Sequence, residues 1–459
     1  MSEQEPTWSY PTALRVLWDR SAYDRGYISD PFADADSAAR GLRRVVRLLD
    51  RLDRPHERFA IAHVAGSKGK GSTSAMIATA LLRAGYQVGL STSPHLHSWR
   101  ERININGEPI DAPTFAALTK RVIAEAEAIE GEEPDLGPVT TFEAVTAMGF
   151  TAFAAAGCDV AVVEVGLGGS YDATNVVIPT VAAITRLDLE HTAVLGSHLV
   201  DIAVAKAGIV KPGRPVVVSP QADDALAVIA TIATERGSPV WVGGRDWQWD
   251  GTWQGFAASG PWGYYPGLRL NLPGPHQVEN ACTAIAALWC LDRAGIAVPE
   301  TAIADGLAAV NWPGRFERVR TDAGPTFILD SAHTPAATAA LAATLASEFP
   351  GRFATIVLGT SADKDVASLV RPLAPIATTL ISTRSSNPRA ASAEVVAAGV
   401  RTSGLETEIA ADVSSAVARA INVAGVNGLV VVTGSLFTVA EAREALGLAT
   451  PDPPIADPV

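Results

Sequence analysis

The sequence predicts an α/β protein of two domains, the first built on a parallel sheet with helices on both faces and the second on a separate sheet with helices between its strands. Near-continuous apolar runs alternate with helical stretches along the chain, which is typical of strands buried on both faces. At 459 residues the chain is longer than one hydrophobic core usually serves. Pro and Gly interrupt the helical pattern at residues 311–316, which predicts an N-terminal domain at residues 1–311 and a smaller C-terminal domain at residues 312–459.

The composition limits the class of protein. Apolar residues make up 48% and charged residues 19% of the chain, as in a soluble enzyme, and the net charge of -13 argues against a general nucleic-acid binder. The polar start MSEQEPTW is unlike a signal peptide and no run of 18 uncharged apolar residues occurs, so we expect neither export nor a membrane span. Cys158, Cys282 and Cys290 lack metal-ligand spacing and suit reduced, buried thiols of a cytoplasmic protein; a reactive Cys290 is the less favoured alternative.

The first predicted strand leads into a glycine-rich loop. Residues 59–64 are apolar, residues 65–72 read AGSKGKGS, and residues 73–84 have an Ala-rich helical pattern. Strand, glycine loop and helix form the context in which backbone N–H groups cradle phosphate oxygens. The alternative, a flexible loop with accidental lysines, leaves the flanking strand and helix unexplained.

Individual residues of this loop have separate expected roles. Its glycines can adopt backbone angles closed to other residues. Lys70 would place a charge near the outer phosphates and Ser72 a hydroxyl near Mg²⁺. The spacing differs from the common Walker form because one glycine separates this lysine from this serine. The predicted phosphate-binding residues are Gly66, Ser67, Lys68, Gly69, Lys70, Gly71 and Ser72.

Further strands and helices alternate after the loop. Strands are predicted at residues 87–92, 159–165, 179–185 and 215–219, and helices at residues 111–130 and 141–156. Polar side chains stand where three of these strands end: Ser93, Glu164 and His191. At that edge of an open α/β sheet ligands bind, and a hydroxyl, a carboxylate and an imidazole could share one Mg²⁺ or Mn²⁺. Each residue alone fits a structural role equally well; together, beside a phosphate loop, they favour a metal site.

Residues 240–272 form a Trp-rich region with a predicted β-hairpin. Trp247 and Trp249 alternate, Asp250 and Gly251 suggest the turn, and Trp253 follows. Aromatic clusters can stack nucleic-acid bases, but in an acidic chain core packing or cover for a substrate is favoured.

A second sheet begins near residue 326. Its strands are predicted at residues 326–330, 354–359, 379–383 and 428–433, with a helix at residues 336–348. Asp330 and His333 follow the first of these strands and would face a nucleotide if the two domains close on each other. Residues 172–175 could be a simple turn, Lys206 a solvated helix lysine, and the tail from Pro451 is expected to be frayed.

Ten short strings occur in a characteristic order. They are AGSKGKGS (65–72), TSPHLHSWRERININGE (92–108), EVGLGGSYDATN (164–175), EHTAVLG (190–196), KAGIVKPG (206–213), GPHQVENACTA (274–284), WPGRFE (312–317), DSAHTP (330–335), ADKD (362–365) and TGSLFTVAEAR (433–443). Together, from about residue 42 to residue 446, they resemble the folylpolyglutamate synthase/dihydrofolate synthase family of the Mur ligase superfamily. We expect the bifunctional bacterial form.

The resemblance implies an N-terminal P-loop ATPase domain, a smaller Rossmann-like C-terminal domain, and site residues by matching position. Besides the phosphate loop, ATP would contact Asn280, Arg315 and Asp330. Mg²⁺ would be bound by Ser72, Ser93, Glu164, His191 and a carbamylated Lys206. The pterin or folate would contact Thr140, Thr141, Phe142, Glu143, Tyr171, Asp172 and Ala173. The residues with catalytic roles would be Lys70, Lys206, Glu164, His191 and His333.

The implied reaction is ATP-dependent ligation of L-glutamate to dihydropteroate or a folate. The substrate carboxylate attacks the γ-phosphate to give an acyl phosphate, and the amine of glutamate then displaces phosphate. Positioning and charge stabilisation suffice for this chemistry, so no side-chain nucleophile is needed. We expect ATP and two Mg²⁺ ions, with Mn²⁺ as a substitute, and a monomer in the cytoplasm.

Several residues depart from the usual pattern of the family. They are Lys68 (usually Asn), Ser170 (usually Arg), Tyr171 (usually Leu), Glu190 (usually Asp), Ala205 (commonly Glu) and Thr334 (usually Asn). Because Lys70 and the metal ligands are intact, an active ligase is favoured. The alternatives are another Mur ligase, such as one acting on a peptidoglycan precursor, and a nucleotide-binding homologue with reduced catalysis.

Overall fold

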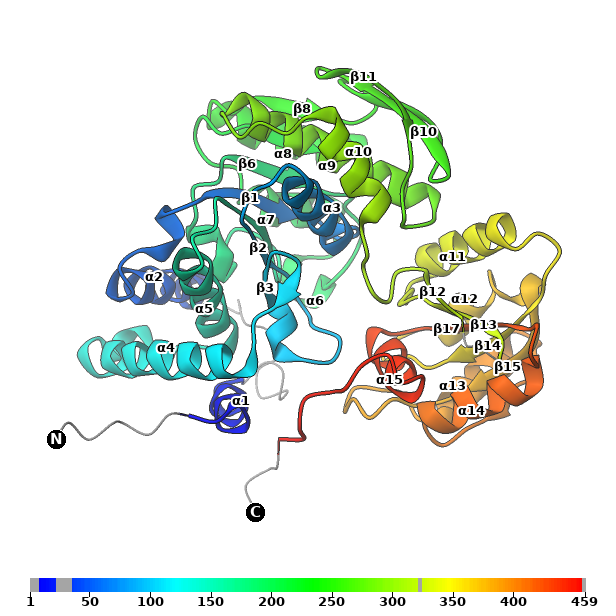
Figure 1. The fold of residues 1–459 in the computed structure, drawn as a ribbon. Helices are drawn as coiled ribbons and strands as arrows, with labels where there is room; N and C mark the ends of the chain where they lie inside the picture. Colours follow the sequence, from blue (N-terminus) through cyan, green and yellow to red (C-terminus); the bar gives the residue numbers. More distant parts are fainter. Residues whose placement is uncertain (1–7, 22–34, 321–323, 456–459) are drawn as a thin grey trace. The chain divides into compact units, whose positions relative to one another are not determined.

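The computed structural model describes residues 8–21, 35–320 and 324–455, and the chain divides into two compact units (Figure 1). Unit 1 comprises Met1–Leu270, Val278–Val310 and Asp452–Val459, and unit 2 comprises Asn271–Gln277 and Asn311–Pro451. The sequence predicts a division between residues 311 and 312. It predicts neither the excursion into unit 2 at residues 271–277 nor the return to unit 1 at Asp452.

A mixed eight-stranded sheet forms the centre of unit 1. Its strands are β1 (Ala60–Ala65), β2 (Val88–Ser91), β3 (Ile103–Ile105), β4 (Glu108–Pro109), β5 (Val160–Glu164), β6 (Val181–Ile184), β7 (Val216–Val218) and β8 (Val240–Val242). In the order β4-β3-β2-β5-β1-β6-β7-β8, β3 runs antiparallel to both of its neighbours, β2 and β4, and all other neighbouring strands are parallel. The prediction of a wholly parallel sheet is therefore wrong at one edge. Asn106 and Gly107, both at positive φ, join β3 to β4 as a tight hairpin.

Helices cover both faces of this sheet, which confirms the predicted α/β class. They are α1 (Tyr10–Asp19), α2 (Ala35–Arg51), α3 (Lys70–Arg83), α4 (Ala112–Glu132), α5 (Thr141–Ala155), α6 (Thr192–Leu195), α7 (Leu199–Ala207), α8 (Asp223–Glu235), α9 (Pro275–Arg293) and α10 (Glu300–Ala309), with the 3₁₀ turns η1 (Pro55–Glu57), η2 (Trp99–Arg102), η3 (Pro134–Leu136) and η4 (Ala173–Val176). Right-handed crossovers place α4, α5, α7 and α8 on one face. The crossover through α3 runs the opposite way along the sheet, so α3 lies on the other face, where it packs against α10.

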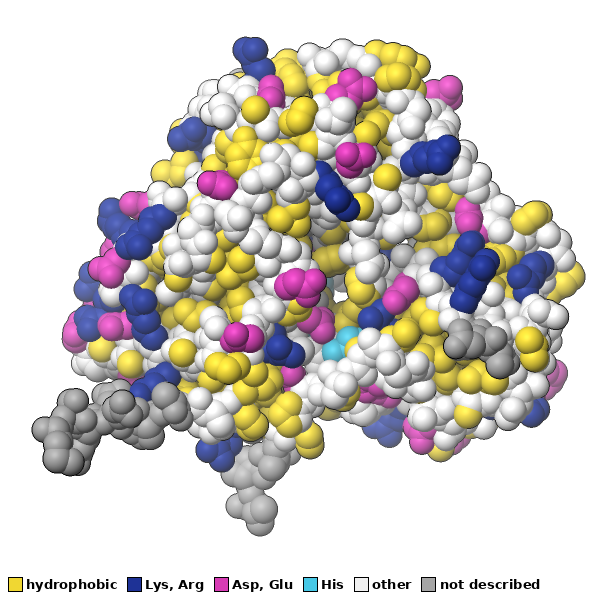
Figure 2. All heavy atoms as spheres, viewed as in Figure 1, with side chains coloured by type: hydrophobic (Ala, Val, Ile, Leu, Met, Phe, Trp, Pro, Cys, Tyr) yellow, Lys and Arg dark blue, Asp and Glu magenta, His cyan; other side chains and the backbone are white. Residues whose placement is uncertain are grey.

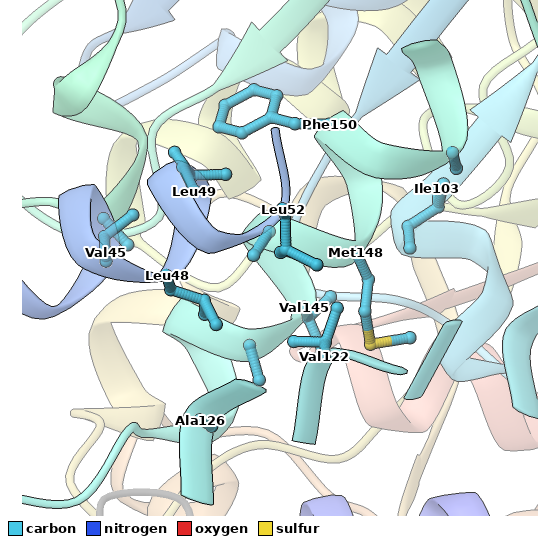
Figure 3. Packing of buried hydrophobic residues seen from close by; sticks show 14 of the residues in the cluster. Val45, Leu48, Leu49, Leu52, Ile103, Val122, Ala126, Val145, Met148 and Phe150 are labelled. Carbon is cyan, nitrogen blue, oxygen red and sulfur yellow. The ribbon is translucent and has the colours of Figure 1, made fainter. Parts of the chain in front are cut away.

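An apolar cluster fixes α5 against the sheet and against α2 and α4 (Figure 3). Leu48 and Leu49 of α2, Val122 of α4 and Phe150 of α5 are fully buried in it. The N-terminus of α5 carries several of the predicted pterin-site residues, so this packing sets the position of those residues.

The Trp-rich region is a separate three-stranded antiparallel sheet. Its strands are β9 (Gln248–Thr252), β10 (Gly255–Gly260) and β11 (Gly263–Leu268), in the order β11-β10-β9. The predicted hairpin is present, but its turn is misplaced: Asp250 and Gly251 lie inside β9 and pair with β10. Trp247 and Trp253 are buried, as core packing requires.

Unit 2 is an α/β unit with its own six-stranded sheet. Its strands are β12 (Glu317–Arg320), β13 (Thr326–Leu329), β14 (Ala354–Leu358), β15 (Ala377–Ser382), β16 (Glu408–Ile409) and β17 (Leu429–Thr433), in the order β12-β13-β17-β14-β15-β16. Its helices are α11 (Pro335–Glu348), α12 (Val366–Val370), α13 (Ala393–Thr402), α14 (Val413–Ala424) and α15 (Leu436–Ala445), with the 3₁₀ turn η5 (Ala374–Ile376). The four predicted strands are confirmed. The two edge strands were not predicted because their short, partly charged segments lack an apolar run.

The surface and the thiols agree with the composition. Over α2 and α4, acidic and basic side chains lie side by side (Figure 2), as in the ion pairs of Arg51 with Glu125 and Glu132. All three cysteines are unpaired and buried. Burial raises the pKa of Cys290 to about 12, so a reactive thiolate there is disfavoured. Among the described residues, no helix has the length and apolar character needed to cross a membrane.

Candidate active site

The phosphate loop (residues 66–69) connects β1 to α3. Gly66 and Gly69 have φ values of 147° and 87°, which other residues rarely adopt. A Cβ on Gly69 would lie 2.3 Å from the Asn280 side-chain oxygen, so Asn280 of α9 closes directly on the loop. Helix α3 begins at Lys70, earlier than predicted, and Gly71 therefore lies in its first turn with helical backbone. Ser72 follows Gly71 and is 3% exposed.

Three lysines and one carboxylate surround this loop. Lys70 Nζ donates to the Gly66 carbonyl at 2.9 Å, and Lys206 Nζ donates to the same carbonyl at 2.8 Å. Lys206 Nζ also lies 2.9 Å from Glu190 Oε1, while Lys68 Nζ is 3.9 Å from Glu190 Oε2. Lys206 is only 2% exposed, which excludes the solvated helix lysine considered from the sequence.

Burial and the neighbouring lysine charges shift the pKa values of Lys206, Glu190 and His191. Burial and the charge of Lys70 lower the pKa of Lys206 to about 8, against the opposing charge of Glu190. Burial acts to raise the pKa of Glu190, but the ammonium groups of Lys70 and Lys206 outweigh it and hold that pKa below its ordinary value. Burial lowers the pKa of His191, which favours the neutral imidazole that can bind a metal.

The predicted metal ligands lie at the carboxyl edge of the parallel strands. Glu164 ends β5, and its Oε2 accepts the Ser93 N–H at 3.1 Å. Ser93 and His191 line the same cavity. In the described ranges no three His, Cys, Asp or Glu side chains gather into a metal site. Hydroxyl, carboxylate and imidazole groups together are a chemically suitable donor set for a divalent cation. The one carboxylate and one imidazole here are too few by themselves, so a metal site would also need the serine hydroxyls as ligands.

A cavity of about 340 Å³ opens beside these residues, wholly within unit 1. Every predicted pterin-site residue lines it: Thr140, Thr141, Phe142, Glu143, Tyr171, Asp172 and Ala173. Arg20, Arg44 and Arg102 contribute guanidinium groups to its wall. The structure thus brings together residues as far apart in the sequence as Arg20 and His191.

Four of the cavity's side chains, those of Arg44, Thr140, Thr141 and Glu143, have structural partners in the protein. Glu143 accepts from Arg44 Nη2 at 2.8 Å and Nε at 3.1 Å, and its Oε2 also accepts the Thr140 N–H at 2.8 Å. Thr140 in turn caps α5, and the Thr141 hydroxyl donates to the Leu17 carbonyl at 2.5 Å. These bonds shape the wall at the start of α5.

Asp172 stabilises another part of the cavity wall. Its Oδ2 accepts the Leu167 N–H at 2.9 Å and its Oδ1 accepts the Thr174 N–H at 3.0 Å. The simple turn considered from the sequence is present, since Asp172 caps η4, but the carboxylate also holds the glycine-rich segment that follows β5. Burial raises the pKa of Asp172.

His95 and Arg102 form a pair that sequence reasoning did not single out. Arg102 Nε donates to His95 Nδ1 at 2.9 Å, and its guanidinium lies 4.7 Å from the centre of the Trp99 ring. Burial and the charge of Arg102 lower the pKa of His95 well below its ordinary value, so the imidazole is neutral. The only sequence signal was the placement of this loop directly after a buried strand.

The predicted site residues of unit 2 cluster after β13. Asp330 accepts the Phe316 N–H at 2.8 Å and the Ala332 N–H at 2.9 Å, which fixes the loop that carries Arg315. Arg315 Nη1 contacts Ser331 Oγ, and His333 Nδ1 lies 2.8 Å from the Ser331 carbonyl. Arg315, Asp330 and His333 therefore share one loop cluster.

Comparisons with known proteins agree over most of the chain. The Mur ligase middle domain matches residues 64–288, and the Mur ligase glutamate ligase domain matches residues 314–436. A dihydrofolate synthase/folylpolyglutamate synthase of Mycobacterium tuberculosis is 36% identical over 384 residues, which cover 78% of this chain and 76% of that protein.

Solved structures show the same likeness. Mycobacterium tuberculosis folylpolyglutamate synthase complexed with ADP has a TM-score of 0.85 and 31% identity, over 96% of this chain and 99% of that chain. Escherichia coli FolC in complex with DHPP and ADP has a TM-score of 0.81 and 30% identity, over 94% of this chain and 97% of that chain.

Proposed function

The chain belongs to the folylpolyglutamate synthase/dihydrofolate synthase family of Mur ligases, and from that premise we propose how its residues carry out the reaction. It is a ligase that uses ATP to join L-glutamate to a pteroate or folate carboxylate. The observation that carries the assignment of residues is one cavity of unit 1. It is lined both by the pterin-site residues and by Ser93 and His191 of the candidate metal site.

The phosphates of ATP bind at the phosphate loop and the N-terminus of α3. Backbone N–H groups there point out of the helix, and the helix dipole favours negative charge. Lys70 exchanges its bond to the Gly66 carbonyl for a phosphate oxygen, a short movement of one ammonium group. Asn280, against Gly69, adds a nucleotide contact within unit 1. Arg315 and Asp330 of unit 2 are proposed ATP contacts by matching position alone.

Mg²⁺ is bound by hydroxyl, carboxylate and imidazole groups. Ser72 and Ser93 supply hydroxyls, Glu164 a carboxylate and His191 a neutral imidazole. Lys206 joins this set as a carbamate, because its lowered pKa leaves part of the amine neutral and able to react with CO₂ near pH 8. When bound, the metal would neutralise charge on the phosphate oxygens.

The cavity orients the acceptor so that its carboxylate meets the γ-phosphate. The carboxylate oxygen forms a bond to phosphorus as the bond to ADP breaks. The amine of glutamate then attacks the acyl phosphate, loses a proton and expels phosphate. His333 keeps the catalytic role that the resemblance implies. Lys70 stays near the transferring phosphoryl group, where its charge stabilises the transition state.

We also propose that the protein is bifunctional, monomeric and cytoplasmic. The named relative carries both synthase activities, which supports bifunctionality. Three buried, unpaired cysteines suit a reducing compartment.

An assay of product formation tests the proposal. Purified protein with ATP, Mg²⁺ and L-glutamate is given 7,8-dihydropteroate or a tetrahydrofolate, and products are identified by mass. Glutamylation of both acceptors is expected. Glutamylation of one only would contradict bifunctionality, and of neither would favour the homologue with reduced catalysis.

Two lysine variants test the residue assignment. Lys70→Ala should lower kcat by about 10²-fold or more, as expected when a charge on the transferring phosphate is lost. Lys120→Ala, on α4 and outside both the phosphate loop and the cavity lined by the pterin-site residues, is the control and should retain activity. An equally active Lys70→Ala protein would refute the phosphate-loop assignment.

A further inference from the structure

A short C-terminal strap (residues 452–455) is bound to unit 1 (Figure 1). The expectation of a frayed tail is wrong for these residues. Asp452 Oδ1 accepts from the Tyr10 hydroxyl at 2.8 Å, its Oδ2 accepts the Trp99 N–H at 2.8 Å, and its own N–H donates to the His97 carbonyl at 3.0 Å. The strap is therefore fixed by both oxygens of one carboxylate.

Apolar packing adds to these bonds. Ile455 packs against the same apolar cluster that contains Phe115 of α4, and Tyr10 stacks edge-on against Phe115 with ring centres 5.3 Å apart. The strap thus contacts α1 and the loop of residues 93–102, and Ile455 packs against the apolar cluster of unit 1.

The other side of the 93–102 loop faces the cavity. Ser93, Pro94 and Arg102 line that cavity. Trp99 links the two sides: Asp452 holds its backbone N–H, and its ring supports the guanidinium of Arg102 at 4.7 Å.

The loop is also braced from within. Glu101 Oε2 accepts the Leu96 N–H at 2.7 Å, and its Oε1 accepts the His97 and Ser98 N–H groups at 3.0 Å. A loop braced in this way moves largely as one piece, so a shift at Trp99 is transmitted to the cavity wall.

We propose that Asp452 is a positioning residue for the acceptor-binding cavity: the strap holds Trp99, and through it Arg102, in the arrangement that receives the pterin substrate. The inference rests on the proposed function of that cavity. Asp452 touches no substrate and acts through the 93–102 loop. Unit 2 ends at Pro451, and the strap is the segment that follows it in the chain. The cavity of unit 1 is therefore positioned by residues that come directly after unit 2 in the sequence.

Four forms of the full enzyme test the proposal. Asp452→Ala removes both side-chain acceptors, and Asp452→Asn keeps one. Truncation after Pro451 removes the strap, whereas truncation after Ile455 leaves it in place and serves as the control. For each form, amide hydrogen exchange of residues 94–102 and the KM values for dihydropteroate, ATP and glutamate are measured.

For Asp452→Ala and the truncation after Pro451, we expect faster exchange across residues 94–102. We expect the KM for dihydropteroate to rise about three- to tenfold, with kcat and the KM for ATP nearly unchanged. Asp452→Asn should be intermediate and the truncation after Ile455 unchanged.

Unchanged exchange in the 93–102 loop, or an equal loss for all three substrates, would overturn the inference. Failure of the proposed function would look different, because the intact chain itself would then not use dihydropteroate.

Discussion

Two of the residues that depart from the family pattern contact each other. The N–H and the hydroxyl of Ser170 both donate to the Ala205 carbonyl, at 2.8 and 3.0 Å. The Ser170 hydroxyl is therefore satisfied by the backbone at position 205 and needs no side-chain partner there. Lys68 and Glu190 likewise lie opposite each other, 3.9 Å apart. Exchanging both partners costs little when the new groups satisfy each other, so these departures are compatible with an active enzyme.

The buried pair of Arg44 and Glu143 should be costly to break from one side. Both side chains are about nine-tenths buried, and Arg44 also donates to the Leu136 carbonyl at 2.5 Å. Arg44→Ala leaves a buried carboxylate without its partner, so we expect the free energy of unfolding to fall by about 3–5 kcal/mol. Urea unfolding of Arg44→Ala, Glu143→Gln and the double variant measures the coupling. Additive losses would contradict a direct pair.

His63 should make the protein sensitive to acid. Thr174 Oγ1 donates to Asp172 at 2.5 Å, so it accepts from His63 Nε2 at 2.8 Å. His63 Nδ1 has no hydrogen-bond partner among the described residues. Burial, reinforced by Lys211, lowers the pKa of His63 to about 3. Between about pH 6.5 and pH 3 the unfolded chain binds the proton and the folded chain does not, so stability is lost as pH falls.

The variant His63→Gln isolates this effect from the titration of carboxylates. Its stability deficit relative to the unmodified protein should shrink below pH 6.5 by up to about 1.4 kcal/mol per pH unit. Urea unfolding of both proteins at pH 7, 5.5 and 4.5 is the measurement. A deficit that does not change with pH would show that His63 titrates normally.

At the level of elements, Gly69 of the phosphate loop has a positive φ of 87° and lies directly against the Asn280 side chain. Gly69→Ala adds a Cβ that would lie 2.3 Å from the Asn280 side chain. Gly85, just past the other end of α3, has a similar φ of 92°, but no atom of the described part of the chain lies within 4 Å of its ideal Cβ. Gly85→Ala is therefore a matched control for backbone strain alone.

We expect Gly85→Ala to lose about 1 kcal/mol of stability, because it forces a non-glycine residue into positive φ, and Gly69→Ala to lose more, because its Cβ also collides with Asn280. Only Gly69→Ala should also raise the KM for ATP, since only there must the loop and Asn280 move apart. Calorimetry and ATP titration of both proteins separate the two effects. A similar rise in KM for Gly85→Ala would mean that strain in α3, and not the contact with Asn280, governs ATP binding.

The phosphate loop could be predicted because its signal is local. A strand, a glycine loop and a helix are adjacent in the chain, and the error of a few residues at the start of α3 reflects a first turn rich in Gly and Ser. The bond from Lys206 to the Gly66 carbonyl spans 140 residues and could not be predicted from spacing. The Asn106–Gly107 turn was visible in the sequence, and reading it as a hairpin would have predicted the antiparallel edge.

The strap illustrates a different limit. Pro-rich composition predicts a frayed end when no partner is known, but Asp452 finds its partners in Tyr10 and Trp99, more than 350 residues away. A short polar segment carries no sequence signal for such contacts.

At the scale of the whole molecule, unit 2 should fold without unit 1. Its sheet has apolar clusters on both faces, one containing Ile356 and Val431 and the other Val357 and Val430. Alternate residues of the same strands thus belong to the two clusters. Helices of unit 2 complete both clusters, so neither face of the sheet needs residues of unit 1 to bury it. We expect a fragment of residues 311–451 to unfold cooperatively, with an enthalpy on the order of 100 kcal/mol near 60 °C.

Calorimetry and circular dichroism of that fragment are the measurements. The control is Val431→Asp, which places a charge in the middle of β17, where Val431 is 0% exposed, and should abolish the transition. The excursion at residues 271–277 is absent from the fragment. Its loss uncovers part of α11, because the ideal Cβ of Gly274 lies 3.2 Å from Thr344, and a somewhat lower melting temperature follows. A fragment without a cooperative transition would show that the core of unit 2 depends on unit 1.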